Sequence, residues 1–395
     1  MKQKHLLVII ASSVICSIYL TNLGDIDGND PISGQEMNNS VAKDETELVP
    51  KIEITEPFFS VSPIALESIS SITPLGALNP PSHIFPTDHI YFMITRQEGA
   101  DRPDIVNVFS PGDLIITSIR AAKHLKADIT DYVLFLEFPG NPEISIMFIH
   151  FSSLNMEILG DISDYSSWSL ESEYSTGGEV YKTWSKNCRI NVQAGDIIGQ
   201  AGGNPGQWAL DLGVYDLKSV PEQVANIERW RSCRYLHSVC PLDYYEEGVV
   251  RDSLFGLVTG DWIDHKQNLI LQDVIGTAQG CWFLEGIKET YPEDLHLALV
   301  NSNLDIDLQV LSVGQSIDGL VSGRYGFTPN ENGLINRDFK DVTPDGNIYG
   351  YIVEGYEGII LIKMQDASTL WVEAMEYIPE IEDWSFTTHK TLFVR

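Results

Sequence analysis

The chain has 395 residues, with 56 acidic against 25 basic side chains and a formal net charge of -31 at pH 7. This length is sufficient for two or three domains, and a hydrophobic content of 43% is that of a globular protein. The negative charge argues against nucleic acid and anionic membrane surfaces as partners, because both would repel the protein.

The first 20 residues have the pattern of a targeting segment. Lys2 and Lys4 precede the apolar run 6–20, which is short for a transmembrane helix. Residues 1–20 therefore predict a signal peptide or an N-terminal membrane anchor. In either case the rest of the chain is extracytoplasmic, secreted or membrane-tethered.

Cys16 stands where a lipoprotein cysteine would, although Ile15 before it is larger than that motif prefers. Residues 21–57 are polar and acidic and show no hydrophobic period, so they predict a disordered acidic tether. We expect the folded part to begin near Ile72.

Residues 72–216 predict an all-β domain. Short runs rich in Val, Ile, Phe and Tyr are separated by Gly, Pro, Asn and Asp, at the spacing of sandwiches and barrels. The expected strands are 89–95, 104–109, 113–121, 131–138, 144–151, 188–192 and 209–216.

Residues 217–258 predict a helical segment, because their apolar residues recur at three- and four-residue spacing. A helix start at Pro221 and the interruption at Pro241 predict two short helices on either side of Cys240. Residues 273–395 return to strand patterns and predict a C-terminal all-β barrel or sandwich. We therefore expect a mainly β protein with a short helical linker.

Besides Cys16 the chain has four cysteines, Cys188, Cys233, Cys240 and Cys281. An even number in an exported chain permits two disulfides, and Cys233 with Cys240 could close a short loop. The sequence leaves the three pairings open. It contains no C-x-x-C motif, which argues against a cysteine zinc site.

Three segments of the first β domain carry polar side chains that suit a metal site. The proline-stiffened stretch PPSHIFPTDH contains His83 and Asp88, IMFIHFSSLN contains His150, and the glycine-rich stretch GDIIGQAGG leads into ALDLGVYD. A proline-rich loop whose polar groups cap the next strand is the structural alternative. Adjacent strand residues point to opposite faces, so we expect His89 to point away from Asp88 and to be structural.

In this order the segments resemble the lysostaphin-type zinc endopeptidases of the bacterial cell wall. The resemblance covers residues 72–216 and implies the fold of that family, a β-sandwich or barrel-sandwich hybrid known as the duplicated hybrid motif. It implies that His83 and Asp88 are zinc ligands, with one more residue between them than in the family, and that His150 is the catalytic histidine beside the substrate carbonyl. The family's H-x-H motif falls on Ala209-Leu210-Asp211. Asp211 would then be the third ligand, and Ala209 replaces the general base.

The substitutions at this motif predict a weakened enzyme. One imidazole and two carboxylates can hold zinc and leave a position for water, but that water is less acidified than in a histidine-rich site. Losing a positioned base costs roughly a hundred- to ten-thousandfold in rate. We therefore expect a degenerate zinc-metallopeptidase-like domain of the cell envelope that binds peptide or wall material, with zinc retained or lost.

Two alternatives remain open. One is an active zinc endopeptidase or amidase-type hydrolase that uses His83, Asp88 and Asp211 as ligands and His150 at the oxyanion. The other is a non-catalytic structural or interaction module that acts through its C-terminal β domain.

Overall fold

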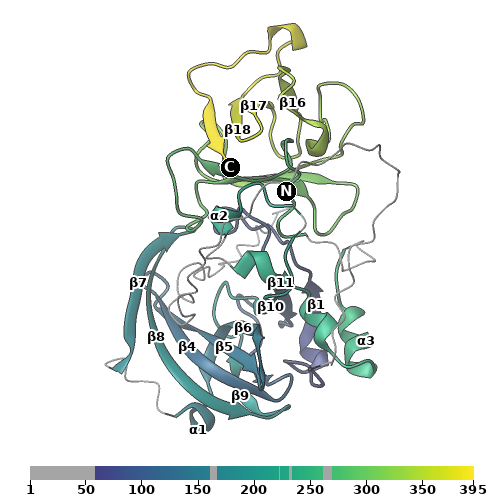
Figure 1. Ribbon diagram of the computed structural model, residues 1–395. Coiled ribbons are helices and arrows are strands. Elements are labelled where there is room, and N and C mark those ends of the chain that lie inside the picture. Colours follow the sequence, from purple (N-terminus) through teal and green to yellow (C-terminus); the bar gives the residue numbers. More distant parts are fainter. Residues whose placement is uncertain (1–57, 161–166, 222, 231–233, 261–268) are drawn as a thin grey trace, which may run out of the picture.

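The computed structural model describes residues 58–160, 167–221, 223–230, 234–260 and 269–395 (Figure 1). The targeting segment, the tether, Cys16 and Cys233 lie outside these residues. Phe59 is fully buried, with its ring 5.6 Å from that of Phe138 and 5.1 Å from that of Tyr245. The folded part therefore begins earlier in the chain than the expected Ile72.

The protein is mainly β, as the sequence predicts, and within the described ranges its first sheet contains eleven strands. The main path runs β1-β2-β10-β6-β5-β4-β8-β7, with β3, β9 and β11 paired at its margins. The strands are β1 (Ile69–Thr73), β2 (Ile90–Ile94), β3 (Val106–Phe109), β4 (Leu114–His124), β5 (Ile129–Phe138), β6 (Asn141–Leu154), β7 (Ser169–Thr176), β8 (Glu179–Val192), β9 (Ile197–Ala201), β10 (Ala209–Asp216) and β11 (Ser238–Val239).

All seven expected strands of this domain are present, and the glycine-rich stretch contains a further strand, β9. Ile197–Ala201 pairs with β3 and β6, so the middle of GDIIGQAGG is a strand. A Cβ at Gly199 would lie 2.5 Å from the carbonyl oxygen of Ser153. Glycine therefore allows the two strands to approach closely.

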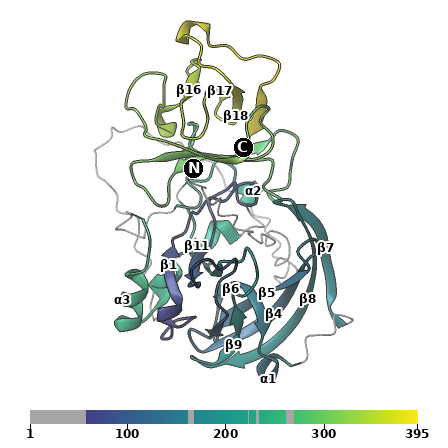
Figure 2. The same cartoon turned by 180° about the vertical axis from the view of Figure 1, so that it is seen from behind.

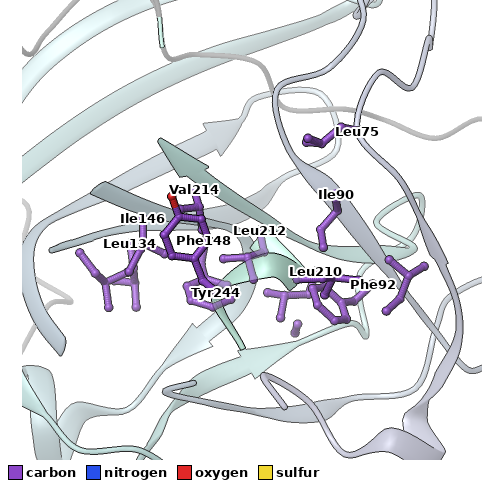
Figure 3. Close-up of a cluster of buried hydrophobic side chains, with 14 of the residues drawn as sticks. Leu75, Ile90, Phe92, Leu134, Ile146, Phe148, Leu210, Leu212, Val214 and Tyr244 are labelled. Carbon is purple, nitrogen blue, oxygen red and sulfur yellow. The ribbon is translucent and has the colours of Figure 1, made fainter. Parts of the chain in front are cut away.

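The two faces of the central strands differ in chemistry. Alternate residues point to opposite faces. Large apolar side chains from β2, β5, β6 and β10 gather on one face, where Tyr244 lies against them (Figure 3). This core includes Ile90, Phe92, Leu134, Ile146, Phe148, Leu210, Leu212 and Val214. Asp211, between two of its members on β10, faces the other way.

The connecting segment contains short helical elements, as expected. They are α2 (Ile227–Trp230), η3 (Arg234–His237), η4 (Pro241–Tyr244) and α3 (Val249–Phe255), and α1 (Met156–Leu159) lies within the first domain. The helices α2 and α3 flank Cys240, as predicted, but α2 begins at Ile227 and not at Pro221. Among the described residues, no helix is long and apolar enough to cross a membrane.

The C-terminal region forms an eight-stranded sheet, in the order β15-β14-β13-β12-β19-β18-β17-β16. A hydrogen bond from the Glu354 amide to the Gly326 carbonyl brings its two edges together, so the sheet is a nearly closed barrel. The strands are β12 (Gly280–Leu284), β13 (Leu297–Asn301), β14 (Gln309–Val313), β15 (Gly323–Phe327), β16 (Tyr349–Tyr351), β17 (Ile359–Asp366), β18 (Thr369–Met375) and β19 (Thr391–Val394). The expected C-terminal barrel is confirmed.

The barrel packs directly on the first domain, and α2 lies at the junction in both views (Figure 1, Figure 2). Trp230 of α2 is 5.6 Å, ring to ring, from Phe283 of β12 and 5.3 Å from Phe85. Thr176, at the end of β7, donates a hydrogen bond to Asp294. One hydrophobic cluster includes residues of both sheets.

The described cysteines are free thiols: Cys188, Cys240 and Cys281. No disulfide joins any two of these three, and the fourth cysteine, Cys233, lies outside the described residues. Burial raises the pKa of the Cys240 thiol to about 12, an effect to which nearby Asp243 adds.

Candidate functional site

A cluster of buried imidazoles and carboxylates lies on the face of the first sheet opposite the apolar core, which we call the polar face. A smaller apolar cluster lies on the same face and consists of Val133, Phe135, Met147, Ile149 and Tyr215. We call the cluster of imidazoles and carboxylates the polar cluster, and its members are drawn from segments far apart in the chain. Each is at most 5% exposed, although charged groups are rarely buried unless they are paired. The polar cluster consists of His83, Asp88, His89, Asp131, His150 and Asp211.

His83 sits on a tight turn. Asn79 and His83 exchange backbone hydrogen bonds of 2.9 and 3.0 Å around the cis bond between Pro80 and Pro81. The ring of His83 is 5.8 Å from that of His89. Its two ring nitrogens have no hydrogen-bond partner among the described residues, and Nδ1 lies 3.9 Å from Oε1 of Glu293.

Asp88 and His89 contact each other, which corrects the expectation that they point apart. His89 Nδ1 lies 2.8 Å from Asp88 Oδ1, at hydrogen-bond distance. Strand alternation does not apply here because β2 begins only at Ile90. His89 Nε2 lies 3.4 Å from Asp211 Oδ2, so one imidazole bridges two carboxylates.

Asp211 is the centre of the polar cluster. It lies on β10 between Tyr91 of β2 and Ile149 of β6, and its Oδ2 is 3.2 Å from His150 Nε2. Burial by itself raises the pKa of Asp211, but the charges and hydrogen bonds of His150 and His89 outweigh it and hold the pKa at about 2. Asp211 is therefore a carboxylate at neutral pH.

His150 reaches the polar face through a β-bulge. Leu134 pairs with Phe148 and Tyr132 pairs with Phe151, so Ile149 and His150 together oppose the single residue Val133. The backbone of His150 is left-handed, with φ of 76°. On a regular strand its side chain would point with Phe148 into the apolar core.

The bulge instead places His150 between two carboxylates. Its Nδ1 lies 3.0 Å from Asp131 Oδ2, and its Nε2 faces Asp211. Burial opposes protonation of His150, but Asp211 and Asp131 raise its pKa well above the usual value. Left-handed backbone at a non-glycine residue is uncommon and clusters at functional sites.

Acid and base side chains thus alternate along a continuous chain of contacts. The order is Asp88, His89, Asp211, His150, Asp131. Burial lowers the pKa of His89, but Asp211 and Asp88 outweigh this effect and raise it to about 9. Both bridging imidazoles are therefore cations at neutral pH, and each charge faces opposite charges on two sides.

Neighbouring side chains close the polar cluster from solvent. Arg234 of η3 lies over the rings of Phe135 and Tyr215, at 4.6 and 5.3 Å from their centroids. Glu293 of the barrel accepts hydrogen bonds from the Phe85 amide at 2.8 Å and from the Tyr235 hydroxyl at 2.9 Å. Sequence reasoning missed Asp131 and Glu293, and neither has a local motif that would identify it.

The position of the expected general base is apolar. Ala209 lies on β10 two residues before Asp211 and is 5% exposed. Its methyl group cannot accept a proton. His89 and His150 are the two imidazoles that contact Asp211. Both ring nitrogens of each already face carboxylates.

The three predicted zinc ligands do not meet at one point that would suit a metal ion. Zinc ligands lie about 2.0–2.3 Å from a shared centre. Asp88 and Asp211 instead face the two nitrogens of His89, and His83 has Glu293 as its nearest carboxylate. Within the described part of the chain, no group of three or more His, Cys, Asp or Glu side chains is arranged to hold a metal.

The structure brings together Asp88, Asp211 and His150, which the resemblance had selected from separate segments, and it places His83 beside them. The family assignment itself stays a prediction that rests on those motif residues. Comparisons with protein-family models, with curated proteins and with solved structures gave no match.

Proposed function

We propose that residues 72–216 form a degenerate peptidase-like domain that acts at the cell envelope and binds peptide or wall material with little or no hydrolysis. The observation that supports this proposal most is the convergence of His83, Asp88, His150 and Asp211 in one buried cluster. A folding requirement alone does not explain so many buried ionisable groups, because replacing buried ion pairs by apolar side chains is often neutral or stabilising.

The chemistry of the polar cluster favours binding over hydrolysis. Hydrolysis of a peptide bond needs an activated water and a group that takes its proton. Ala209 supplies no such group, and His150 is engaged by Asp131 and Asp211. The active hydrolase remains the alternative, with His150 at the oxyanion.

The charge of the chain limits the material that it would bind. A net charge of -31 disfavours anionic wall polymers and favours neutral or cationic peptides. An extracytoplasmic location, which the targeting segment predicts, would bring the domain to such peptides.

A co-sedimentation experiment tests the proposal. The purified full-length chain is mixed with insoluble wall material that has been stripped of anionic polymers, and both bound protein and released soluble fragments are measured. We expect binding without release, in wild type and in a His83→Ala variant alike. Release that is lost on chelation and in His83→Ala would support the zinc hydrolase. Absence of both binding and release would contradict the proposal and favour an interaction module that acts through the barrel.

A further inference from the structure

The position of His89 points to a way in which the polar cluster is held together. The resemblance selects two carboxylates, Asp88 and Asp211, as metal ligands. One ring now lies between them, with Nδ1 at 2.8 Å from Asp88 Oδ1 and Nε2 at 3.4 Å from Asp211 Oδ2. A divalent ion shared by these two carboxylates would have to occupy the same space.

The ring of His89 fills the space between these carboxylates. Nδ1 is at hydrogen-bond distance from Asp88, and Nε2 faces Asp211 at 3.4 Å without a hydrogen bond. The ring is 2% exposed, so the side chains around it hold it in this place.

We propose that the ring of His89 occupies the place of a divalent metal ion between Asp88 and Asp211, so that this site is held together without a metal. The ring contacts Asp88 at hydrogen-bond distance and lies 3.4 Å from Asp211. A bound ion would link the same two carboxylates through metal–oxygen bonds. His83, whose ring nitrogens have no hydrogen-bond partner among the described residues, remains beside the site without engaging either carboxylate.

The neighbouring histidine extends this arrangement. His150 lies between Asp211 and Asp131 with the same two-sided geometry, at 3.2 and 3.0 Å. Asp211 therefore contacts two imidazoles through the same oxygen atom, Oδ2. An oxygen used in this way is poorly placed to coordinate zinc as well. This inference does not depend on what the domain binds, since it concerns only the contacts inside the polar cluster.

The test compares wild type with a His89→Ala variant. Removal of the ring leaves Asp88 and Asp211 facing an opening beside His83, which is a donor set that zinc accepts. We expect the wild-type full-length chain, purified without chelators, to hold no stoichiometric zinc and to keep the same melting temperature when zinc is added. The His89→Ala variant should melt at a lower temperature, and added zinc should raise that temperature while one ion binds per chain.

A matched control is His389→Ala, which removes a histidine that pairs with Asp318 at 2.8 Å on the surface of the barrel. Zinc should not change its melting temperature. The proposal is overturned if wild type holds one zinc per chain that His83→Ala removes, or if folded His89→Ala gains neither zinc nor stability from zinc. If His89→Ala folds only when zinc is present, the proposal is supported. The wall-binding experiment measures bound protein and released fragments, whereas this one measures zinc content and melting temperature. Failure of this inference is therefore distinguishable from failure of the proposed function.

Discussion

Oδ2 of Asp211 lies 3.2 Å from Nε2 of His150, although the two residues come from different strands and from different motifs. Strand pairing of β10 with β6 sets Asp211 opposite Ile149, and the bulge then turns His150 toward it. The same oxygen lies 3.4 Å from Nε2 of His89. One carboxylate therefore joins the two halves of the polar cluster.

Asp211→Asn should destabilise the protein strongly. The substitution keeps the shape of the side chain but leaves two buried imidazolium groups without their shared counter-charge. Breaking a buried ion pair by removing one partner costs roughly 3–5 kcal/mol. Urea unfolding followed by tryptophan fluorescence measures the change in the free energy of unfolding. In the control Asp101→Asn, which removes an exposed carboxylate beside Arg102, the stability should not change. Equal effects in the two variants would contradict this prediction.

The stability of the protein should fall as the pH rises from about 6.5 to about 9. The pKa of His89 is raised in the folded state from 6.5 to about 9, so its stabilising contribution is fully present below 6.5 and is lost through this window. The shift corresponds to roughly 3 kcal/mol. Melting temperatures of wild type and His89→Gln, measured across this pH range, should converge on the alkaline side. A constant difference between them would contradict the assignment.

Acid should remove the contribution of the Asp211 carboxylate to the stability of the protein. Its pKa is lowered from 3.8 to about 2, so this contribution is present above 3.8 and is lost as the pH falls toward 2. The protonation of His296 affects stability in a different pH range. Burial lowers its pKa from 6.5 to about 4, so the stability that depends on its neutral ring is full above pH 6.5 and is lost as the pH falls toward 4. On the acid side, the difference in melting temperature between wild type and Asp211→Asn should therefore shrink only below pH 4.

The stability of variants at His150 should depend on how well the new residue tolerates the left-handed backbone at this position. Asparagine tolerates positive φ, whereas a β-branched residue does not. Both His150→Asn and His150→Val lose the contacts to Asp131 and Asp211. The valine variant should be less stable than the asparagine variant by about 1–2 kcal/mol. Denaturant unfolding of the two variants measures this difference. Equal stabilities would show that the backbone at residue 150 rearranges freely.

Glu293 should couple the barrel to the first domain. Its carboxylate accepts hydrogen bonds from the Phe85 amide and the Tyr235 hydroxyl, and both donors are left unsatisfied in Glu293→Ala. A buried unsatisfied donor costs about 1–3 kcal/mol. We expect a lower unfolding free energy, whereas the exposed Glu285→Ala control should match wild type. A Glu293→Ala variant as stable as this control would show that the contact is dispensable.

The strands of the core could be predicted because their residues carry the signal themselves. β4, β5, β6 and β10 are rich in β-branched and aromatic residues and lie between turn residues. β7, by contrast, has the polar sequence SLESEYST and becomes a strand only through its pairing with β8. Pairing between distant segments outweighs local propensity in such a case.

The candidate site could be predicted in part. Motif order identified His83, Asp88, His150 and Asp211. Strand alternation misplaced His89, since the start of β2 at Ile90 is set by pairing with β1 and β10. The direction of His150 depends on the register of β5 against β6, and the β-strand period does not reveal that register. Asp131 and Glu293 join the polar cluster only through tertiary contacts.

The most direct test of the charged chain is NMR of the histidine side-chain nitrogens at pH 7. The account predicts hydrogen on both ring nitrogens of His89 and His150, whereas His296, whose pKa is about 4, is neutral. Spectra of His89→Gln and His150→Asn assign the signals. A neutral or metal-bound ring at His89 would contradict the alternating chain from Asp88 to Asp131.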